Sequence, residues 1–108
     1  MSNFQNDPTL NKALNILKSE FNFSKSYLFG SKANSTDSMT SDYDLVLVVL
    51  NSEKDELERR IQARTLLRDF DSSFDVFIYT QKEFDQYKSD FGSIAETALN
   101  TGIELDFL

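Results

Sequence analysis

The sequence contains neither cysteine nor histidine, and these two absences restrict its chemistry. Without cysteine, a disulfide scaffold and a thiolate metal site are excluded, and a reducing cytoplasm is the compartment that fits. Without histidine, a histidine-ligated zinc site is impossible. Any general base must therefore be a carboxylate, a lysine, a tyrosine or water. We expect a cytoplasmic protein.

Long apolar runs and a surplus of basic residues are also missing. The longest apolar run is far shorter than the roughly 20 residues that span a bilayer, and Met1 to Leu10 do not have the pattern of a signal peptide. The 18 acidic and 11 basic residues give a net charge of -7, which disfavours direct binding of a long nucleic acid. A length of 108 residues fits one domain over residues 1–108.

Apolar periodicity predicts an alternation of helices and strands. Asp7 can cap a helix that begins at Pro8, and apolar residues at helical spacing predict that this helix extends over residues 8–21. Strands are predicted over residues 26–29, 42–50 and 74–79. The second of these is almost continuously apolar, as expected for a central strand that is covered on both faces.

Capping patterns predict the remaining helices. Ser52 with Asp55 predicts a helix through about residue 70, and Thr80 with Glu83 predicts a short helix after the third strand. The apolar face of the first of these helices is predicted to consist of Leu57, Ile61, Leu67 and Phe70. Together with a last helix over 93–100, these elements predict an α/β fold in which helices pack on a small mixed sheet of three to four strands.

Two further features are predicted from spacing. Arg60, Arg64 and Arg68 line one helix face, which could meet an acidic partner, although a solvated face paired with Glu56 is favoured. Gly102 stands where a left-handed helix cap is expected. The alternating apolar residues that follow predict an extended tail, docked either on its own sheet or on a partner. These residues are Ile103, Leu105 and Phe107.

Asp42 and Asp44 are candidate metal ligands at the start of the central strand. Residues two apart in a strand point to the same face, so their carboxylates repel each other unless a cation lies between them. Carboxylate oxygens suit Mg²⁺, which also keeps waters and binds substrate phosphates. The alternative is that the two aspartates belong to a polar loop that enters the strand.

Gly30 and Ser31 follow the preceding strand and are a candidate phosphate site. Glycine allows a close backbone approach to a phosphate, and the amides that follow favour an anion. Ser31 adds a hydroxyl donor, and Lys32 can meet a phosphate as a point charge. Taken alone, Gly30 could equally be an ordinary turn glycine.

Asp75 is the third candidate carboxylate, in an otherwise apolar strand. A buried charge there requires a partner or a metal ion. The alternative is that Asp75 lies at the exposed beginning of the strand.

The combination of these motifs resembles the minimal nucleotidyltransferases of the DNA polymerase β-like superfamily. The family pattern is Gly-Ser, ten residues, Asp-x-Asp and a third aspartate on a later strand. Here it corresponds to Gly30-Ser31, Asp42, Asp44 and Asp75. The sequence departs from the family where Lys32 replaces a frequent arginine and a second glycine is missing. The resemblance implies a polymerase β-like nucleotidyltransferase fold.

The resemblance also implies an activity, which is transfer of AMP from ATP to a hydroxyl group with release of pyrophosphate. Asp42, Asp44 and Asp75 would be the catalytic residues and would hold two Mg²⁺ ions, whereas Gly30, Ser31 and Lys32 would bind the nucleotide. Many similar proteins are antitoxins that AMPylate a tyrosine of a HEPN-type ribonuclease toxin. Two alternatives remain, namely an antitoxin that acts by binding alone and a transferase for a small molecule such as an aminoglycoside.

Overall fold

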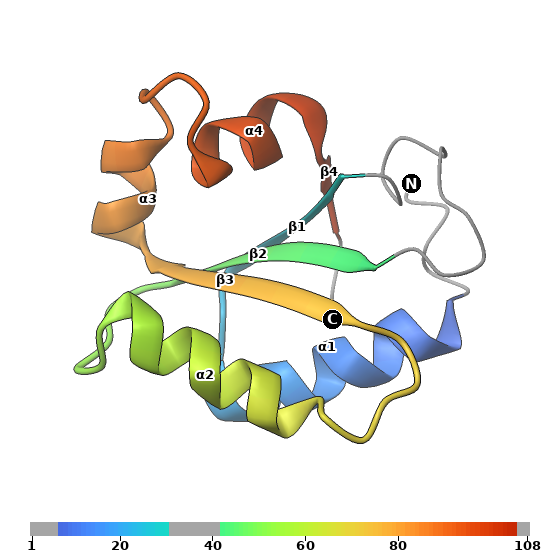
Figure 1. Ribbon diagram of the computed structural model, residues 1–108. Helices are drawn as coiled ribbons and strands as arrows, with labels where there is room; N and C mark the ends of the chain where they lie inside the picture. Colours follow the sequence, from blue (N-terminus) through green and yellow to red (C-terminus); the bar gives the residue numbers. More distant parts are fainter. Residues whose placement is uncertain (1–6, 31–41, 106–108) are drawn as a thin grey trace.

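The computed structural model describes residues 7–30 and 42–105, which form two helical layers around one sheet (Figure 1). In chain order the described elements are α1 (Pro8–Phe21), β1 (Lys25–Phe29), β2 (Tyr43–Val49), α2 (Glu56–Leu66), β3 (Phe74–Thr80), α3 (Gln81–Tyr87), α4 (Ile94–Thr101) and β4 (Ile103–Glu104). None of these helices is long and apolar enough to cross a bilayer.

The sheet is mixed, with the strand order β3-β2-β1-β4 over the described residues. β1 pairs with β2 and β4 in antiparallel fashion, and β2 pairs with β3 in parallel fashion. Helices α1 and α2 cover one face, and α3 and α4 cover the other (Figure 1). The predicted α/β fold with a small mixed sheet is therefore confirmed.

Strand β2 is central, as its apolar sequence predicts, and its side chains alternate between two cores. Tyr43, Leu45, Leu47 and Val49 belong to the core that contains residues of α1 and α2. Val46 and Val48 belong to the second core, which contains residues of α3 and α4. All residues of β2 except Asp44 are buried. Burial on both faces explains why this strand lacks the usual alternation of polar and apolar residues.

The two ends of α1 follow from local sequence. The helix begins at the predicted residue, where the amide of Leu10 donates to Oδ1 of Asp7 over 3.0 Å and Pro8 occupies the first turn. It ends at Asn22, which adopts a left-handed conformation with φ 48°. Asparagine tolerates this conformation better than most residues, so its position there is consistent with the end of a helix.

The predicted beginning of α2 is wrong, and its predicted apolar face is wrong in part, since Leu67 and Phe70 pack in the core but the other two residues do not. The capping residue is Asp55, which forms a reciprocal capping box with Glu58, so Ser52 precedes the helix by several residues. Leu57 and Ile61, predicted to be buried, are 65% and 56% exposed. The buried side of this helix instead carries Arg59, which is 2% exposed.

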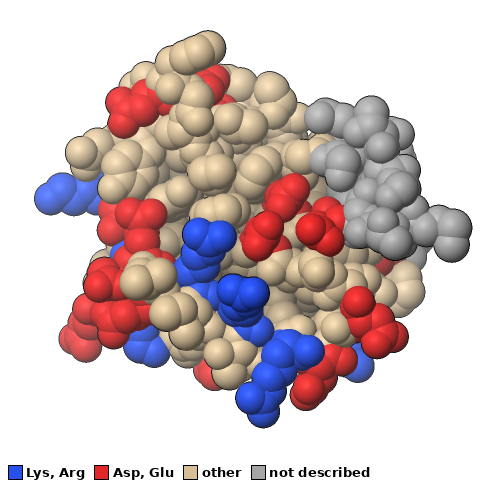
Figure 2. All heavy atoms as spheres, viewed as in Figure 1, with Lys and Arg blue, Asp and Glu red and all other residues tan. Residues whose placement is uncertain are grey.

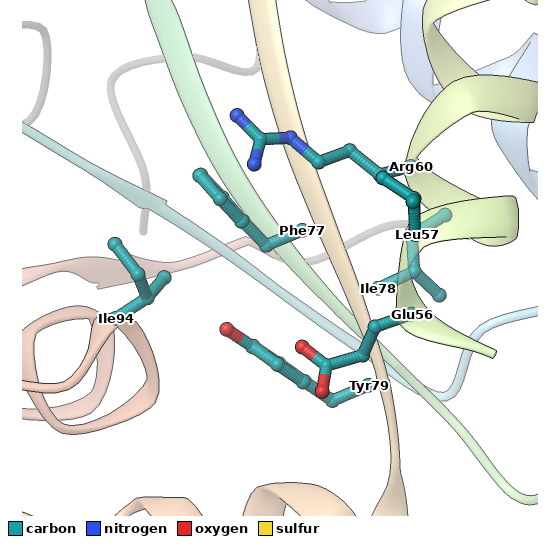
Figure 3. A pocket seen from close by; sticks show the side chains of 7 residues that line it. All are labelled: Glu56, Leu57, Arg60, Phe77, Ile78, Tyr79 and Ile94. Carbon is teal, nitrogen blue, oxygen red and sulfur yellow. The ribbon is translucent and has the colours of Figure 1, made fainter.

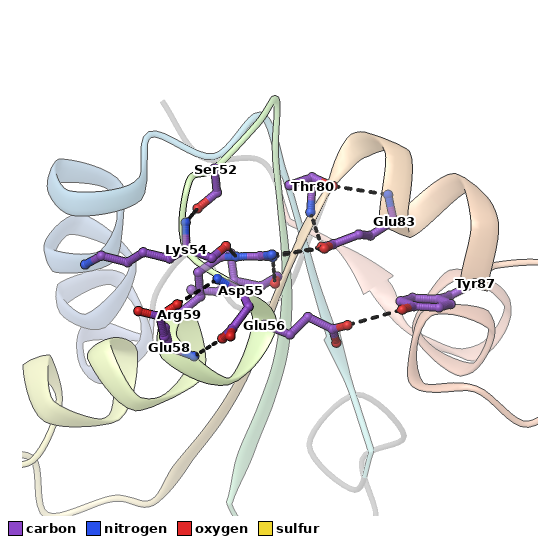
Figure 4. A network of polar contacts seen from close by, with 10 residues as sticks. Ser52, Lys54, Asp55, Glu56, Glu58, Arg59, Thr80, Glu83 and Tyr87 are labelled. Carbon is purple, nitrogen blue, oxygen red and sulfur yellow. Dashed lines mark hydrogen bonds and ion pairs between the residues drawn. The ribbon is translucent and has the colours of Figure 1, made fainter.

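Arg59 is buried because it connects three elements (Figure 4). Its guanidinium forms a bidentate pair with Glu83 of α3, over 2.9 and 3.0 Å, and donates to the carbonyl of Ile78 in β3. Its Nε donates to the carbonyl of Lys54 over 3.0 Å. The hydrogen bond from Arg59 is the main cause that lowers the pKa of Glu83. Glu83 also completes the predicted capping box with Thr80.

The end of the described chain confirms one prediction and corrects another. β4 pairs with β1, and Leu105 is buried, so this part of the tail docks on its own sheet; Phe107 lies outside the described residues. Gly102 is not a left-handed cap, since its φ is -87°. A Cβ atom there would overlap the carbonyl oxygen of Ala98 and lie 2.8 Å from that of Leu28. The glycine is therefore explained by close packing of α4 against β1.

Replacing Arg59 by alanine should destabilise the protein by about 3 kcal/mol, because Glu83 would lose its partner in a partly buried site. Urea denaturation of the two proteins measures the difference. Lys88→Ala is the control, because it removes an exposed ion pair with Asp85 and should cost less than about 1 kcal/mol. Equal losses for the two variants would show that the Arg59 contacts do not stabilise the fold.

Candidate functional site

The candidate site is a row of residues that crosses three strands. In the sheet register, Phe29 lies opposite Asp44, and Asp44 lies opposite Asp75. Gly30 follows Phe29 directly, at the end of β1. Side chains at paired positions share a face of the sheet, so Asp44 and Asp75 are neighbours on the face that also carries Val46. This is the face covered farther along by α3 and α4.

Repulsion between carboxylates is the main electrostatic feature of this row. Asp44 is half-buried, whereas Asp42 and Asp75 are exposed. Burial raises the pKa of Asp44, and the charges of Asp75 and then Asp42 raise it further. Asp75 thus lies at an exposed position, as one of the two sequence interpretations held. It is nevertheless held beside Asp44 by the pairing of β2 with β3.

Gly30 is in direct contact with the Asp44 side chain. Its φ of +78° is in the region that L side chains rarely adopt, and a Cβ atom would overlap Oδ2 of Asp44. Glycine is therefore required here both by the backbone conformation and by the neighbouring carboxylate. Ser31 and Lys32, the other two residues predicted to bind a nucleotide, lie outside the described residues.

The donor set of the row fits Mg²⁺ in its chemistry. The side chains of Asp42, Asp44 and Asp75 offer only carboxylate oxygens, which this ion prefers, and a cation would relieve the repulsion between them. Within residues 7–30 and 42–105, no three such side chains are grouped closely enough to hold an ion by themselves. Asp44 with Asp42 or Asp75 would then hold the ion together with waters and substrate phosphates, as is usual for Mg²⁺.

Arginines that were not predicted as part of the site lie beside the carboxylates. A hollow of about 400 Å³ is lined by Asp42 and Asp75 together with Arg64 and Arg68. The arginine face is solvent-exposed, as predicted, but among the described residues no ion pair joins it to Glu56, which accepts a hydrogen bond of 3.3 Å from the hydroxyl of Tyr87. The signal in the sequence was the spacing of Arg60, Arg64 and Arg68, although it does not reveal which element the arginines face.

Replacing Gly30 by alanine should cost more stability than replacing Gly92, a matched control. Gly92 has a similar φ of +83° but nothing within 4 Å of an added Cβ atom. Gly92→Ala should therefore report backbone strain alone, about 1 to 2 kcal/mol. In an Asp44→Ala background the excess cost of Gly30→Ala should disappear. Thermal or urea denaturation measures all variants, and an excess that persists without the Asp44 carboxylate contradicts the contact.

The free energy of unfolding of the Asp44→Asn variant should increase relative to that of the wild type as the pH rises. The folded-state pKa of Asp44 is raised, so its contribution to stability is present below the unfolded-state pKa and is lost as the pH rises through the folded-state pKa. Asparagine does not titrate and escapes this loss. Urea denaturation in EDTA at about pH 4 and about pH 7 measures the effect, with exposed Asp90→Asn as control. A gain that is the same at both pH values would contradict the carboxylate repulsion.

Solved structures share this fold at low sequence identity. A mutant MntA–HpeT toxin–antitoxin has a TM-score of 0.61 at 17% identity, with 91% of this chain and 73% of that chain covered. A toxin–antitoxin with AMP-PNP has a TM-score of 0.54 at 17% identity, with the same coverage. A candidate nucleotidyltransferase from Sulfolobus solfataricus has a TM-score of 0.55 at 22% identity, covering 72% of this chain and 69% of that chain. At these identities the likeness establishes the fold.

The sequence itself establishes the family. No protein of curated function matches the chain significantly. The profile of the family described as "Polymerase beta, Nucleotidyltransferase" matches residues 11–90, which include Gly30, Asp42, Asp44 and Asp75. The chain therefore belongs to the polymerase β-like nucleotidyltransferase family, and its fold is the one predicted from its motifs.

Proposed function

We propose that this protein, as one domain over residues 1–108, transfers AMP from ATP to a hydroxyl group of a partner protein in the cytoplasm. The observation that carries the proposal is the row in which Gly30, Asp44 and Asp75 lie side by side on three strands. A glycine that contacts a carboxylate allows a phosphate to approach a bound cation closely. A second carboxylate on the next strand is suitably placed to meet the attacking group.

Each residue of the row has a separate proposed role. Gly30, with Ser31 and Lys32, would bind the β- and γ-phosphates. Asp42 and Asp44 would hold Mg²⁺ together with these phosphates and waters, and Asp75 would complete the site nearer the acceptor. Two bound Mg²⁺ ions would neutralise the phosphates and stabilise the attacking and leaving oxygens.

In the transfer itself, the acceptor oxygen forms a bond to the α-phosphorus, and the bond from that phosphorus to the bridging oxygen breaks. Pyrophosphate leaves, and the acceptor proton passes to Asp75 or to water. The exposure of Asp75 supports this role, because an acceptor can reach its carboxylate from solvent.

The proposed partner is a toxin of the HEPN ribonuclease type, with a tyrosine as the acceptor. The support is that two structures with this fold are toxin–antitoxin structures, one of them with AMP-PNP. The MntA–HpeT mutant carries two aspartate-to-glutamate substitutions two positions apart, which is the spacing of Asp42 and Asp44. The net charge of -7 also favours a protein acceptor over a nucleic acid.

Mass spectrometry of the partner, after incubation with this protein, ATP and Mg²⁺, tests the proposal. We expect increments of one AMP on the partner and release of pyrophosphate. Asp44→Asn should reduce the rate by at least about 100-fold while the circular dichroism spectrum is retained. Asp90→Asn, an exposed carboxylate outside the row, should leave the rate unchanged.

Two results would contradict the proposal. An inhibited but unmodified partner would indicate an antitoxin that acts by binding alone. Full activity of the Asp44→Asn protein would show that the row is not the catalytic centre, whichever molecule accepts the nucleotide.

A further inference from the structure

The outward side of α2 and the turn that follows it carry an unusual mixture of exposed apolar and basic side chains. Leu57 and Ile61 are 65% and 56% exposed, and Arg60, Arg64 and Arg68 are exposed beside them. We call these five residues the α2 stripe. Between residues 7–30 and 42–105, no ion pair involves any of the three arginines. A row of three arginines without an ion pair is conspicuous in a chain with a net charge of -7.

Hollows connect the α2 stripe with β3 along much of the strand. The hollow that contains Asp42 and Asp75 shares Arg64 and Asp75 with a second one of about 310 Å³, into which Leu57 and Ile61 also project. The second hollow shares Arg60 and Leu57 with a third of about 320 Å³. We call these three hollows together the α2–β3 groove. Figure 2 shows basic side chains gathered over α2, next to acidic ones at the sheet.

The far part of the α2–β3 groove has an aromatic floor (Figure 3). The guanidinium of Arg60 lies 4.5 Å from the centre of the Phe77 ring, so it is positioned over the strand while the residue stays exposed. Tyr79 lies farther along the same floor, with Ile94 of α4 across from it. Burial and then the charge of Glu56 raise the pKa of Tyr79 to about 12, so this ring remains neutral.

Strand β3 is an edge of the described sheet, and part of its backbone is available for pairing. The carbonyl of Ser73 accepts from the amide of Tyr43 in β2 over 3.0 Å. Backbone groups alternate in direction along a strand, so those of Phe74 and Val76 point away from β2. Val76 is buried, whereas Phe74 is only partly buried, so the backbone of Phe74 is the accessible part of this edge. The carbonyl of Ile78, which also points away, already accepts from Arg59. An added segment could therefore form backbone hydrogen bonds with Phe74, next to Asp75, and not farther along.

The row of the candidate site has two different flanks. Gly30 lies on the β1 side of Asp44, where the nucleotide phosphates are proposed to bind, and Asp75 lies on the β3 side. An acceptor that attacks opposite the leaving pyrophosphate must approach from the other flank, since the two groups are in line. The α2–β3 groove opens at this flank, because Asp75 lines two of its three hollows.

We infer that the α2–β3 groove binds an extended acidic segment of the partner protein, which brings its acceptor hydroxyl to Asp75. The inference rests on the proposed function and specifies how the acceptor is recognised. Carboxylates of the segment would pair with Arg60, Arg64 and Arg68, and its apolar side chains would cover Leu57 and Ile61. A single-stranded RNA would also suit the arginines, but the exposed leucine and isoleucine and the open strand edge favour a peptide.

Binding of a fluorescein-labelled random copolymer of glutamate and tyrosine, measured by anisotropy without ATP, tests the inference. A protein with a charge of -7 should repel this polymer, so binding must arise from a local basic site. The double variant Arg60→Glu/Arg64→Glu should bind at least about tenfold more weakly. The matched control is Lys25→Glu/Lys82→Glu, which changes the net charge equally at exposed positions outside the groove and should bind within about twofold of the wild type.

Several outcomes would overturn the inference. These are no binding of the copolymer at low salt, equal weakening in both double variants, or binding of a single-stranded RNA in place of the copolymer. A loss of ATP affinity in Arg60→Glu/Arg64→Glu, with copolymer binding unchanged, would assign the arginines to the nucleotide instead.

The same variants distinguish a failure of this inference from a failure of the proposed function. With AMP transfer to copolymer tyrosines as a second readout, the arginine variant should raise the KM for the copolymer and leave the KM for ATP unchanged. Arginine-dependent binding without AMP transfer to any acceptor would overturn the proposed function alone. AMP transfer to the copolymer that does not depend on the arginines would overturn only the inference.

Discussion

The pairing of β2 on both of its edges is the constraint on which the rest of the structure depends. Its antiparallel register with β1 and parallel register with β3 place Phe29, Asp44 and Asp75 in one line. A slip of one residue on either side would move Asp44 away from its neighbours and turn apolar side chains out of a core. Two separate cores, one on each face of the sheet, hold this register in place.

The same register places like charges side by side. Asp44 is half-buried beside two other carboxylates, and Gly30 closes the space over its side chain without leaving room for a Cβ atom. Such an arrangement opposes folding while the carboxylates are ionised and favours cation binding once the protein is folded. The apolar residues of β2, which are buried throughout, supply the stability that an unfavourable charge cluster requires.

Helix α2 shows how one element serves both the fold and the proposed site. Its inner side holds Arg59, whose guanidinium bridges α3 and β3 and neutralises Glu83. This network fixes α2 against the edge strand, so the outward arginines lie at a defined distance from Asp75 along the α2–β3 groove. The exposure of Leu57 and Ile61 is a consequence of the same packing, because the helix side opposite Arg59 has no covering layer among the described residues.

The sequence by itself determined the elements whose signals are local. Asp7 and Pro8 specify where α1 begins, Thr80 and Glu83 specify where α3 begins, and the apolar run of β2 specifies a central strand. It also indicated Gly30, Asp42, Asp44 and Asp75 as candidate site residues, because the spacing of a motif is a property of the chain. The tertiary structure alone decided that Arg59 is buried, that Leu57 is exposed and that Gly102 is extended. Arg59 is buried because of Glu83, and Gly102 is required by the carbonyl of Leu28, and both partners are distant in sequence. Leu57 is exposed because no described element covers its side of α2. Periodicity within one segment contains no information about these neighbours.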